Sequence, residues 1–207
     1  MITIADYTLG RLIAQTKPHM AERSDYESLQ VLNFDYDGRH LHTWATNRYT
    51  IGVSRTAVIN ADDEPWMATV GRQQVQELQA AVRLLDSRPV YLERTASSLV
   101  LSNETGTRIF VDLIDQKKPL DWRNLLLSPL DAKPADARMA MTPKYFAAWK
   151  NLPHPVQMWS TGEGRMVLIS APDFLGGQMP VRREGEDASL LRELESWRPV
   201  AVQLEAA

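Results

Sequence analysis

The sequence predicts an α+β fold in which a strand–helix–strand–strand–strand unit occurs three times along the chain. Two amphipathic helix patterns are each followed by three short runs in which apolar and polar residues alternate, as in half-buried strands. A third helix start, Thr142-Pro143, is followed by three more such runs. The alternative is an α+β domain whose element order repeats by chance, because the copies share too little sequence to be aligned.

The first copy begins with a helix over 7–17, where Leu9, Leu12 and Ile13 have helical spacing and Pro18 follows. Strands are expected at 28–36, 40–46 and 50–58, followed by a polar loop at 60–65. The second copy is expected to comprise a strand at 66–70, a helix at 71–85, and strands at 89–94, 98–102 and 108–114.

Residues 128–138 are rich in Pro, Ala and Asp and are expected to form a linker. The third copy then comprises a strand at 139–141, a helix from Thr142 to about Asn151, and strands at 156–160, 166–170 and 174–181. The expected organisation is a complete two-unit domain at 1–127, the linker at 128–138, a half domain at 139–183 and a tail at 184–207.

The bulk composition is that of a soluble globular protein, with 207 residues, 44% hydrophobic and 24% charged. There is no cysteine, no secretory signal pattern and no apolar run long enough to span a membrane. The absence of cysteine fits a reducing compartment. The net charge is −3. Any contact with DNA must therefore be weak or confined to one face.

No motif indicates an enzyme, a metal site or a cofactor. Nucleophile-elbow, phosphate-loop and metalloprotease patterns are all absent. His40 and His42 share one strand face but have no third ligand at useful spacing, so we expect exposed polar side chains. Asp35 and Asp37 flank a turn and are expected to be solvated. Gly176-Gly177 indicates a bulge or a close backbone approach.

Four segments resemble the bacterial DNA polymerase III beta subunit, the sliding clamp, and occur in the family's order. Residues 41–53 resemble a strand pair that reads ATD-x-x-R-L-A-V in the family, and 107–126 resemble a segment ending F-P-D-Y-R-x-L-L-P. Thr142 to Phe146 resembles N-P-K-Y-L, and Gln178 to Arg182 resembles a terminal M-P-M-R. Departures include Asn47 for Asp, Thr50 for Arg and Leu127 for Pro.

The resemblance implies a ring in which helices line a hole and sheets form the outer shell, without catalysis. It also implies a location in the cytoplasm of a bacterial cell or a phage-infected host. Duplex DNA would then be contacted through its phosphates, without base readout, by basic residues on the helices. The candidates are Arg11, Lys17, Arg72, Arg83, Lys144 and Lys150. The alternative is that these are ordinary solvated helix faces. Charge reversal at Arg72, Arg83 and Lys150 is expected to distinguish the two.

The family also binds short peptides of the polymerase and the clamp loader in a pocket between domains. The matching positions are Thr46, Arg48, Tyr49, Thr50, Ile51, Leu127, Met179, Pro180, Val181 and Arg182. Met suits a pocket that accepts different apolar side chains. For Ile51, Leu127 and Val181 the alternative is an ordinary core position.

Length gives a further expectation. A family ring contains twelve such units, and this chain contains three, so four chains of 23.4 kDa would close a homotetramer of about 94 kDa with cyclic or dihedral symmetry. The missing half domain leaves a second interpretation open, a clamp-like adaptor that binds partner peptides without encircling DNA. An unrelated α+β enzyme is the third.

Overall fold

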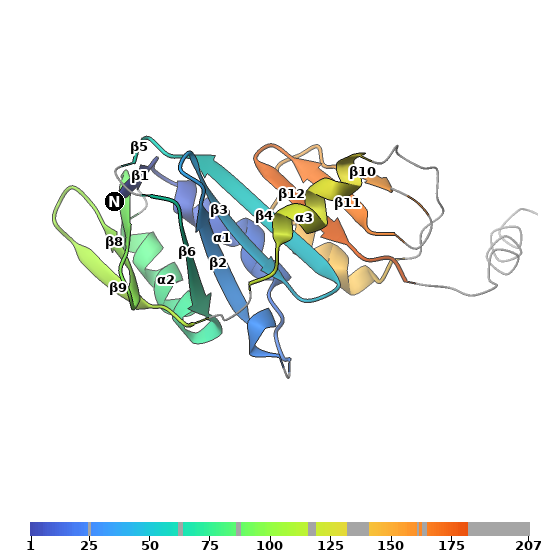
Figure 1. Ribbon diagram of the computed structural model, residues 1–207, viewed down its shortest axis with the longest axis horizontal. Coiled ribbons are helices and arrows are strands. Elements are labelled where there is room, and N and C mark those ends of the chain that lie inside the picture. Colours follow the sequence, from blue (N-terminus) through green and yellow to red (C-terminus); the bar gives the residue numbers. More distant parts are fainter. Residues whose placement is uncertain are drawn as a thin grey trace, which may run out of the picture.

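The structure is a computed structural model that describes residues 1–24, 26–61, 64–85, 88–115, 119–131, 141–160, 162 and 165–181 (Figure 1). In this part of the chain the strands form two antiparallel sheets. One has the order β5-β1-β7-β8-β9, made of Asn60–Ala61, Ile2–Ile4, Val90–Arg94, Ser98–Ser102 and Arg108–Asp112. The other has the order β10-β11-β12-β4-β3-β2-β6, made of Gln157–Ser160, Val167–Ala171, Phe174–Gln178, Thr50–Ala57, His40–Thr46, Val31–Tyr36 and Trp66–Gly71.

The first two units exchange their first strands. β1 begins the first unit but pairs with β7 of the second, and β6 begins the second unit but pairs with β2 of the first. The helices α1 (Thr8–Thr16) and α2 (Arg72–Leu85) pack their apolar stripes on one core shared by both sheets. Leu12 and Leu78 are fully buried there, and burial of such a side chain contributes about 1.5–3 kcal/mol. The two units therefore form one domain.

The third unit extends the sheet of the first, because β12 pairs with the free side of β4. On the helix side of this junction, the imidazole of His19 packs on the indole of Trp149 with 4.4 Å between ring centroids. Its Nδ1 lies 3.0 Å from Oγ1 of Thr50. Gly52 is required here, since a Cβ at this position would lie 2.3 Å from Cδ2 of His19.

Burial of His19 makes stability depend on pH. Desolvation lowers the pKa of its imidazole to about 3, while in the unfolded chain the imidazole keeps its ordinary pKa of 6.5. The unfolded state then binds more protons between these values, so stability is lost as pH falls below 6.5. We expect the free energy of unfolding, measured in urea, to fall by about 2 kcal/mol between pH 7 and pH 5. His19→Gln should flatten this dependence, and His154→Gln, at an exposed position, should not.

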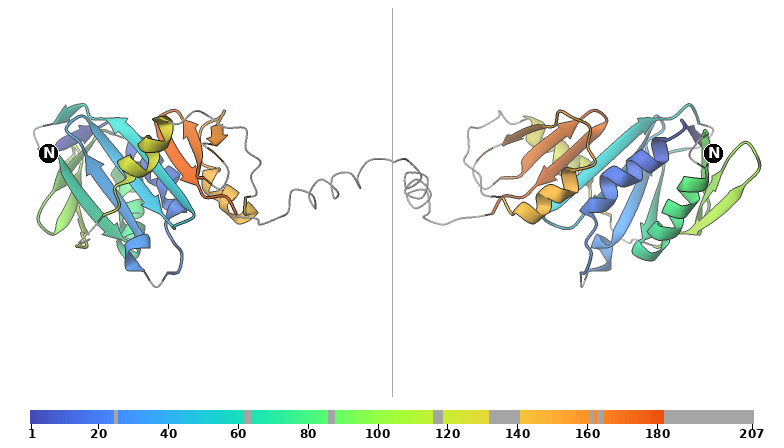
Figure 2. Two further views of the ribbon diagram at one scale, coloured as in Figure 1. Left: turned by 45° about the vertical axis from the view of Figure 1, so that its right-hand side comes forward. Right: turned by 180° about the vertical axis from the view of Figure 1, so that it is seen from behind.

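Three helical elements lie side by side on the same face of the sheets. The view from behind in Figure 2 shows α1 and α2 in front of the strands, with the 3-10 helix η4 (Pro143–Trp149) next to α1. Asn151 Nδ2 donates to the carbonyl oxygen of Ala14 at 2.8 Å and links the third unit to α1. No helix of the described part is long and apolar enough to cross a membrane.

Several local predictions differ from the structure. The loop expected at 60–65 begins with the short strand β5, which pairs with β1. The helix expected from Thr142 is η4, a 3-10 helix in which only Ala148 and Trp149 are buried, so packing gives little support to a longer α-helix. Met141 lies in no strand, and the rest of the strand expected at 139–141 lies outside the described residues.

Two elements and part of the linker also differ from expectation. β1 and α3 (Trp122–Leu127) are too short to show a period and were not predicted. The first part of the expected linker is a 3-10 turn, η3 (Ser128–Asp131), which follows directly on α3. Residues 132–138 and the tail lie outside the described residues.

Candidate DNA-facing surface and partner-binding hollow

The helix face gathers basic side chains. Within the described residues, α1, α2 and η4 carry Arg11, Arg72, Arg83 and Lys144 but one acid, Glu77. Lys17 and Lys150 follow directly on α1 and η4. This face is therefore positive although the whole chain has a net charge of −3.

The six candidates on this face are not equally free to bind a ligand. Arg11 is half-buried and donates to Ser54 Oγ at 3.4 Å and to the carbonyl oxygen of Arg55 at 3.1 Å. Arg72 donates to the carbonyl oxygens of Ala21 and Glu22. Both guanidinium groups therefore stabilise the fold through hydrogen bonds within the chain.

The other four candidates are exposed. Lys17 donates from Nζ to Gln79 Oε1 at 2.6 Å, which bridges α1 and α2. The ammonium of Lys144 lies 4.9 Å from the ring centroid of Tyr145. Arg83 and Lys150 are exposed at α2 and at the end of η4. These four side chains are available to phosphates.

The opposite face of the seven-stranded sheet is covered in part by α3, which crosses in front of β4 in Figure 1. Successive strand residues point to opposite sides, so Trp44, Ile51 and Val53 face α3, while Thr50 and Gly52 face His19 on the helix side. Trp122 and Leu126 of α3 complete this outer cluster with Leu168.

Asp35 anchors α3 to the sheet. Its carboxylate accepts from Nε1 of Trp122 at 3.0 Å and forms an ion pair with the guanidinium of Arg123. Asp35 is 5% exposed, so the prediction of a solvated carboxylate is wrong. The reason is tertiary: both partners lie nearly 90 positions further along the chain, at separations of 87 and 88.

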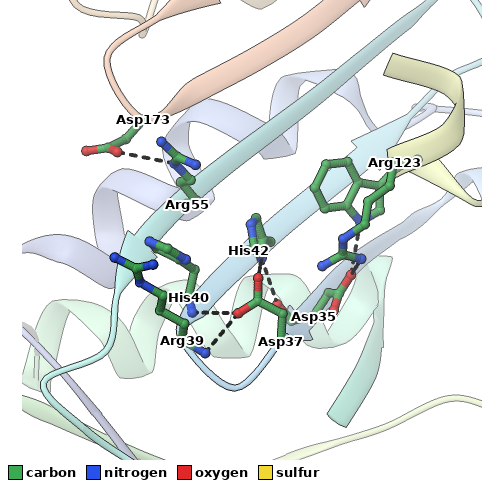
Figure 3. A network of polar contacts seen from close by, with 9 residues as sticks. Asp35, Asp37, Arg39, His40, His42, Arg55, Arg123 and Asp173 are labelled. Carbon is green, nitrogen blue, oxygen red and sulfur yellow. Dashed lines mark hydrogen bonds and ion pairs between the residues drawn. The ribbon is translucent and has the colours of Figure 1, made fainter. Parts of the chain in front are cut away.

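His42 lies beside this anchor, in the centre of Figure 3. Its ring packs on that of Trp122 with 5.2 Å between centroids, and its Nδ1 lies 3.8 Å from Oδ2 of Asp37. His42 is 7% exposed, so the expected exposed side chain is also wrong. Burial lowers the pKa of the imidazole, against the opposing effect of Asp37. The side chain is therefore neutral near pH 7.

A hollow of about 360 Å³ opens between α3, β4 and the β11–β12 hairpin. Its lining consists of His42, Val53, Arg55, Trp122, Arg123, Leu127, Ser170, Ala171, Asp173, Phe174 and Leu175. Arg55 and Asp173 form an exposed ion pair at 3.5 Å on one side, and Arg123 lies on the other (Figure 3). The hollow thus combines an apolar floor with two guanidinium groups, a combination that suits a short peptide with apolar anchors and an acidic or carboxylate group.

The structure divides the sequence-predicted pocket residues between several places. Leu127 lines the hollow, Ile51 belongs to the buried outer cluster, and Thr50 faces His19. Arg182 lies outside the described residues.

The remaining pocket residues lie at the β3–β4 turn and beyond β12. The backbone N–H of Met179 donates to the carbonyl oxygen of Tyr49 at 2.8 Å, which brings the end of β12 to this turn. Arg48 lies over the ring of Tyr26, and Thr46 Oγ1 accepts from the backbone N–H of Arg48. Pro180 and Val181 follow, with Val181 44% exposed. These residues form a second surface, separate from the hollow.

The sequence did not point to the other residues of the hollow. His42 and Asp173 lie far apart in the sequence, and no motif joins them to Arg55. The segment Asp121-Trp122-Arg123 was the one sequence feature near the hollow, and it forms the start of α3. In the described residues no group of three His, Asp or Glu side chains is placed to hold a metal ion.

No family model and no curated protein matches this sequence. Solved structures do match. The DNA polymerase III subunit beta of Pseudomonas aeruginosa superposes with a TM-score of 0.68 at 15% identity, over 87% of this chain and 66% of that one. The chain has the sliding-clamp fold. The sliding clamp of Bacillus subtilis gives a TM-score of 0.66 at 16% identity over 88% and 64% of the two chains, and the beta chain of Streptococcus pneumoniae gives 0.67 at 13% over 87% and 64%.

The predicted α+β clamp fold is therefore confirmed, with repeated units, helices on one face and antiparallel sheets. The chain spans about two thirds of the length of the clamp chains it matches, between 64% and 66%. The exchanged first strands of units one and two join these two units through both sheets.

Proposed function

We propose that this chain is a subunit of a DNA sliding clamp, a non-enzymatic ring that surrounds duplex DNA and increases the processivity of a polymerase. The observation that supports this most strongly is the helix face, where exposed Lys17, Arg83, Lys144 and Lys150 lie with a single acid among the described residues. Such a surface attracts phosphates weakly and without base readout, which lets a ring move along DNA. The proposed location is the cytoplasm, with the replication machinery.

Three units per chain require four chains for a ring of twelve units. The expected assembly has a mass of about 94 kDa, four times the 23.4 kDa of one chain. Light scattering at micromolar concentration should give this value. A clean monomer would exclude a closed ring, and a dimer would point to an open arrangement or to a missing partner chain.

The hollow beside α3 is the proposed docking site for short peptides of a polymerase or a clamp loader. Leu127→Glu replaces an apolar side chain of its lining by a carboxylate that a bound peptide would cover. Peptide binding should weaken at least about tenfold, because the lost apolar contact and the desolvation of the carboxylate together cost more than about 1.4 kcal/mol. Isothermal titration with peptides from the polymerase of the same host measures this. The matched control is Leu125→Glu, on the same helix, 40% exposed against 44% for Leu127, and outside the hollow. Equal losses in both variants would contradict the assignment.

A clamp-like adaptor that binds partner peptides without encircling DNA is the second candidate. It is favoured by one observation: the hollow is complete within a single chain, whereas a ring needs several. An adaptor would bind peptides normally after the helix charges are reversed and would never be retained on DNA.

A further inference from the structure

The five-stranded sheet ends at β9, whose outer side has no strand neighbour in the described part of the chain. Ile109 and Val111 face the core, and Val111 is fully buried. Arg108, Phe110 and Asp112 face outward, with Phe110 60% exposed. An exposed edge with a large apolar residue at its centre readily pairs with another strand.

The sequence of β9 is complementary to itself in the antiparallel sense. If two copies pair around Phe110, Arg108 of each lies opposite Asp112 of the other, and the two Phe110 rings meet. Ile109 then lies opposite Val111 on the core side. Opposite charges in facing positions stabilise a strand pair, and like charges destabilise it.

The chain already contains a contact of this kind. β4 and β12 are the last strands of the first and third units, and they pair antiparallel, edge to edge. β9 is the last strand of the second unit, so its free edge is equivalent to the one that β12 covers on β4.

We propose that β9 pairs with β9 of a second copy about a two-fold axis at Phe110. The end strand that the third unit would offer to β9 in a head-to-tail ring is β10, and its residues Gln157–Ser160 have no charge to meet Arg108 or Asp112. Within the chain, Arg108 Nη2 lies 3.4 Å from Glu93 Oε2 on β7 in an exposed pair. Pairing of two β9 strands would exchange this contact for one with Asp112 of the second copy. A two-fold contact joins the same surface of both copies, so this surface must be complementary to itself, and the sequence of β9 meets this condition.

This contact deepens the proposed ring and rests on it for its biological role. If the half domains of two neighbouring chains, residues 139–183, also join about a two-fold axis, these axes and those at β9 would alternate around the ring. Four chains would then close it in dihedral symmetry. Cyclic symmetry is then excluded, because a cyclic ring pairs two different edges.

The chain has no cysteine, so single cysteines can report the contact. Facing residues of antiparallel strands have Cα atoms about 4.5–5.5 Å apart, within the range of a disulfide. Phe110→Cys should form a disulfide-linked dimer on mild oxidation. Arg108→Cys alone should not, but a mixture of Arg108→Cys and Asp112→Cys chains should. The control, Leu84→Cys on α2, is 73% exposed and should stay unlinked.

Cross-linking of Phe110→Cys at least about tenfold above the Leu84→Cys level supports the contact. No excess over that level, or cross-linking of Arg108→Cys alone as strong as that of Phe110→Cys, would overturn it. The cross-linking result and the retention of the protein on DNA test the contact and the clamp function independently. A specific β9 dimer that is never retained on DNA keeps the contact and refutes the clamp, while retention on DNA without the cross-link keeps the clamp and refutes the contact.

Discussion

Replacement of Arg83, Lys144 and Lys150 by glutamate should lower the affinity for duplex DNA at least about 100-fold at low salt. The three side chains are exposed on the helix face, and a four-chain ring would lose twelve positive charges and gain twelve negative ones. Arg72 is better left unchanged, because its guanidinium donates to the carbonyl oxygens of Ala21 and Glu22 and its loss would disturb the fold. Fluorescence anisotropy with a labelled duplex measures the affinity.

The matched control carries the same charge change away from the helices, as Arg39→Glu, Arg94→Glu and Arg165→Glu. All three are exposed, on a turn or at a strand end. The control should bind DNA within a fewfold of the parent chain, and its salt dependence should be unchanged. If the control weakens binding as much as the helix-face variant, the helix face does not contact DNA and only net charge matters.

Replacement of Asp35 by alanine should destabilise the fold by about 2–4 kcal/mol in urea unfolding. The change leaves the indole N–H of Trp122 without its acceptor and Arg123 without its ion-pair partner. Asp35 is nearly buried, whereas the Arg123 side chain is 40% exposed, so solvent offsets part of the lost pairing and places the effect in the lower half of that range.

Asp35→Asn separates the contribution of the hydrogen bond from Trp122 from that of the ion pair with Arg123. Its amide oxygen still accepts from Trp122, but the charge opposite Arg123 is gone, so about half of the destabilisation should remain. A loss below about 0.5 kcal/mol for Asp35→Ala would show that α3 is held by the apolar packing of Trp122 and Leu126 alone.

The sequence predicted the limits of helices and strands well where a local apolar pattern extends over the whole element. α2 and the alternating strands β3 and β8 lie within a residue of their predicted limits, because their periods extend over whole elements. β1, β5 and α3 are too short to carry a period, and their pairing is decided by distant strands. Of the bulge and the close backbone approach expected at Gly176-Gly177, the structure shows the approach at Gly176, where a Cβ would lie 2.8 Å from the carbonyl oxygen of Ile51.

The candidate site was less predictable than the fold. The basic helix residues could be named, because the clamp resemblance implies that helices line the hole, but their hydrogen bonds to loops could not be predicted. The hollow depends on Asp35, Trp122 and Asp173, which meet only through sheet pairing and the placement of α3. Burial of Asp35 and His42 follows from this long-range packing, and local polarity indicated the opposite.

Retention on circular DNA tests the central claim most directly. Chains are assembled at micromolar concentration in the presence of a closed circular duplex, washed in high salt and then treated with a nuclease that cuts the circle once. Encirclement predicts that the protein stays on the uncut circle at a salt concentration that removes phosphate contacts, and that cutting releases it. Equal loss from the circle and from linear DNA in high salt would contradict a clamp.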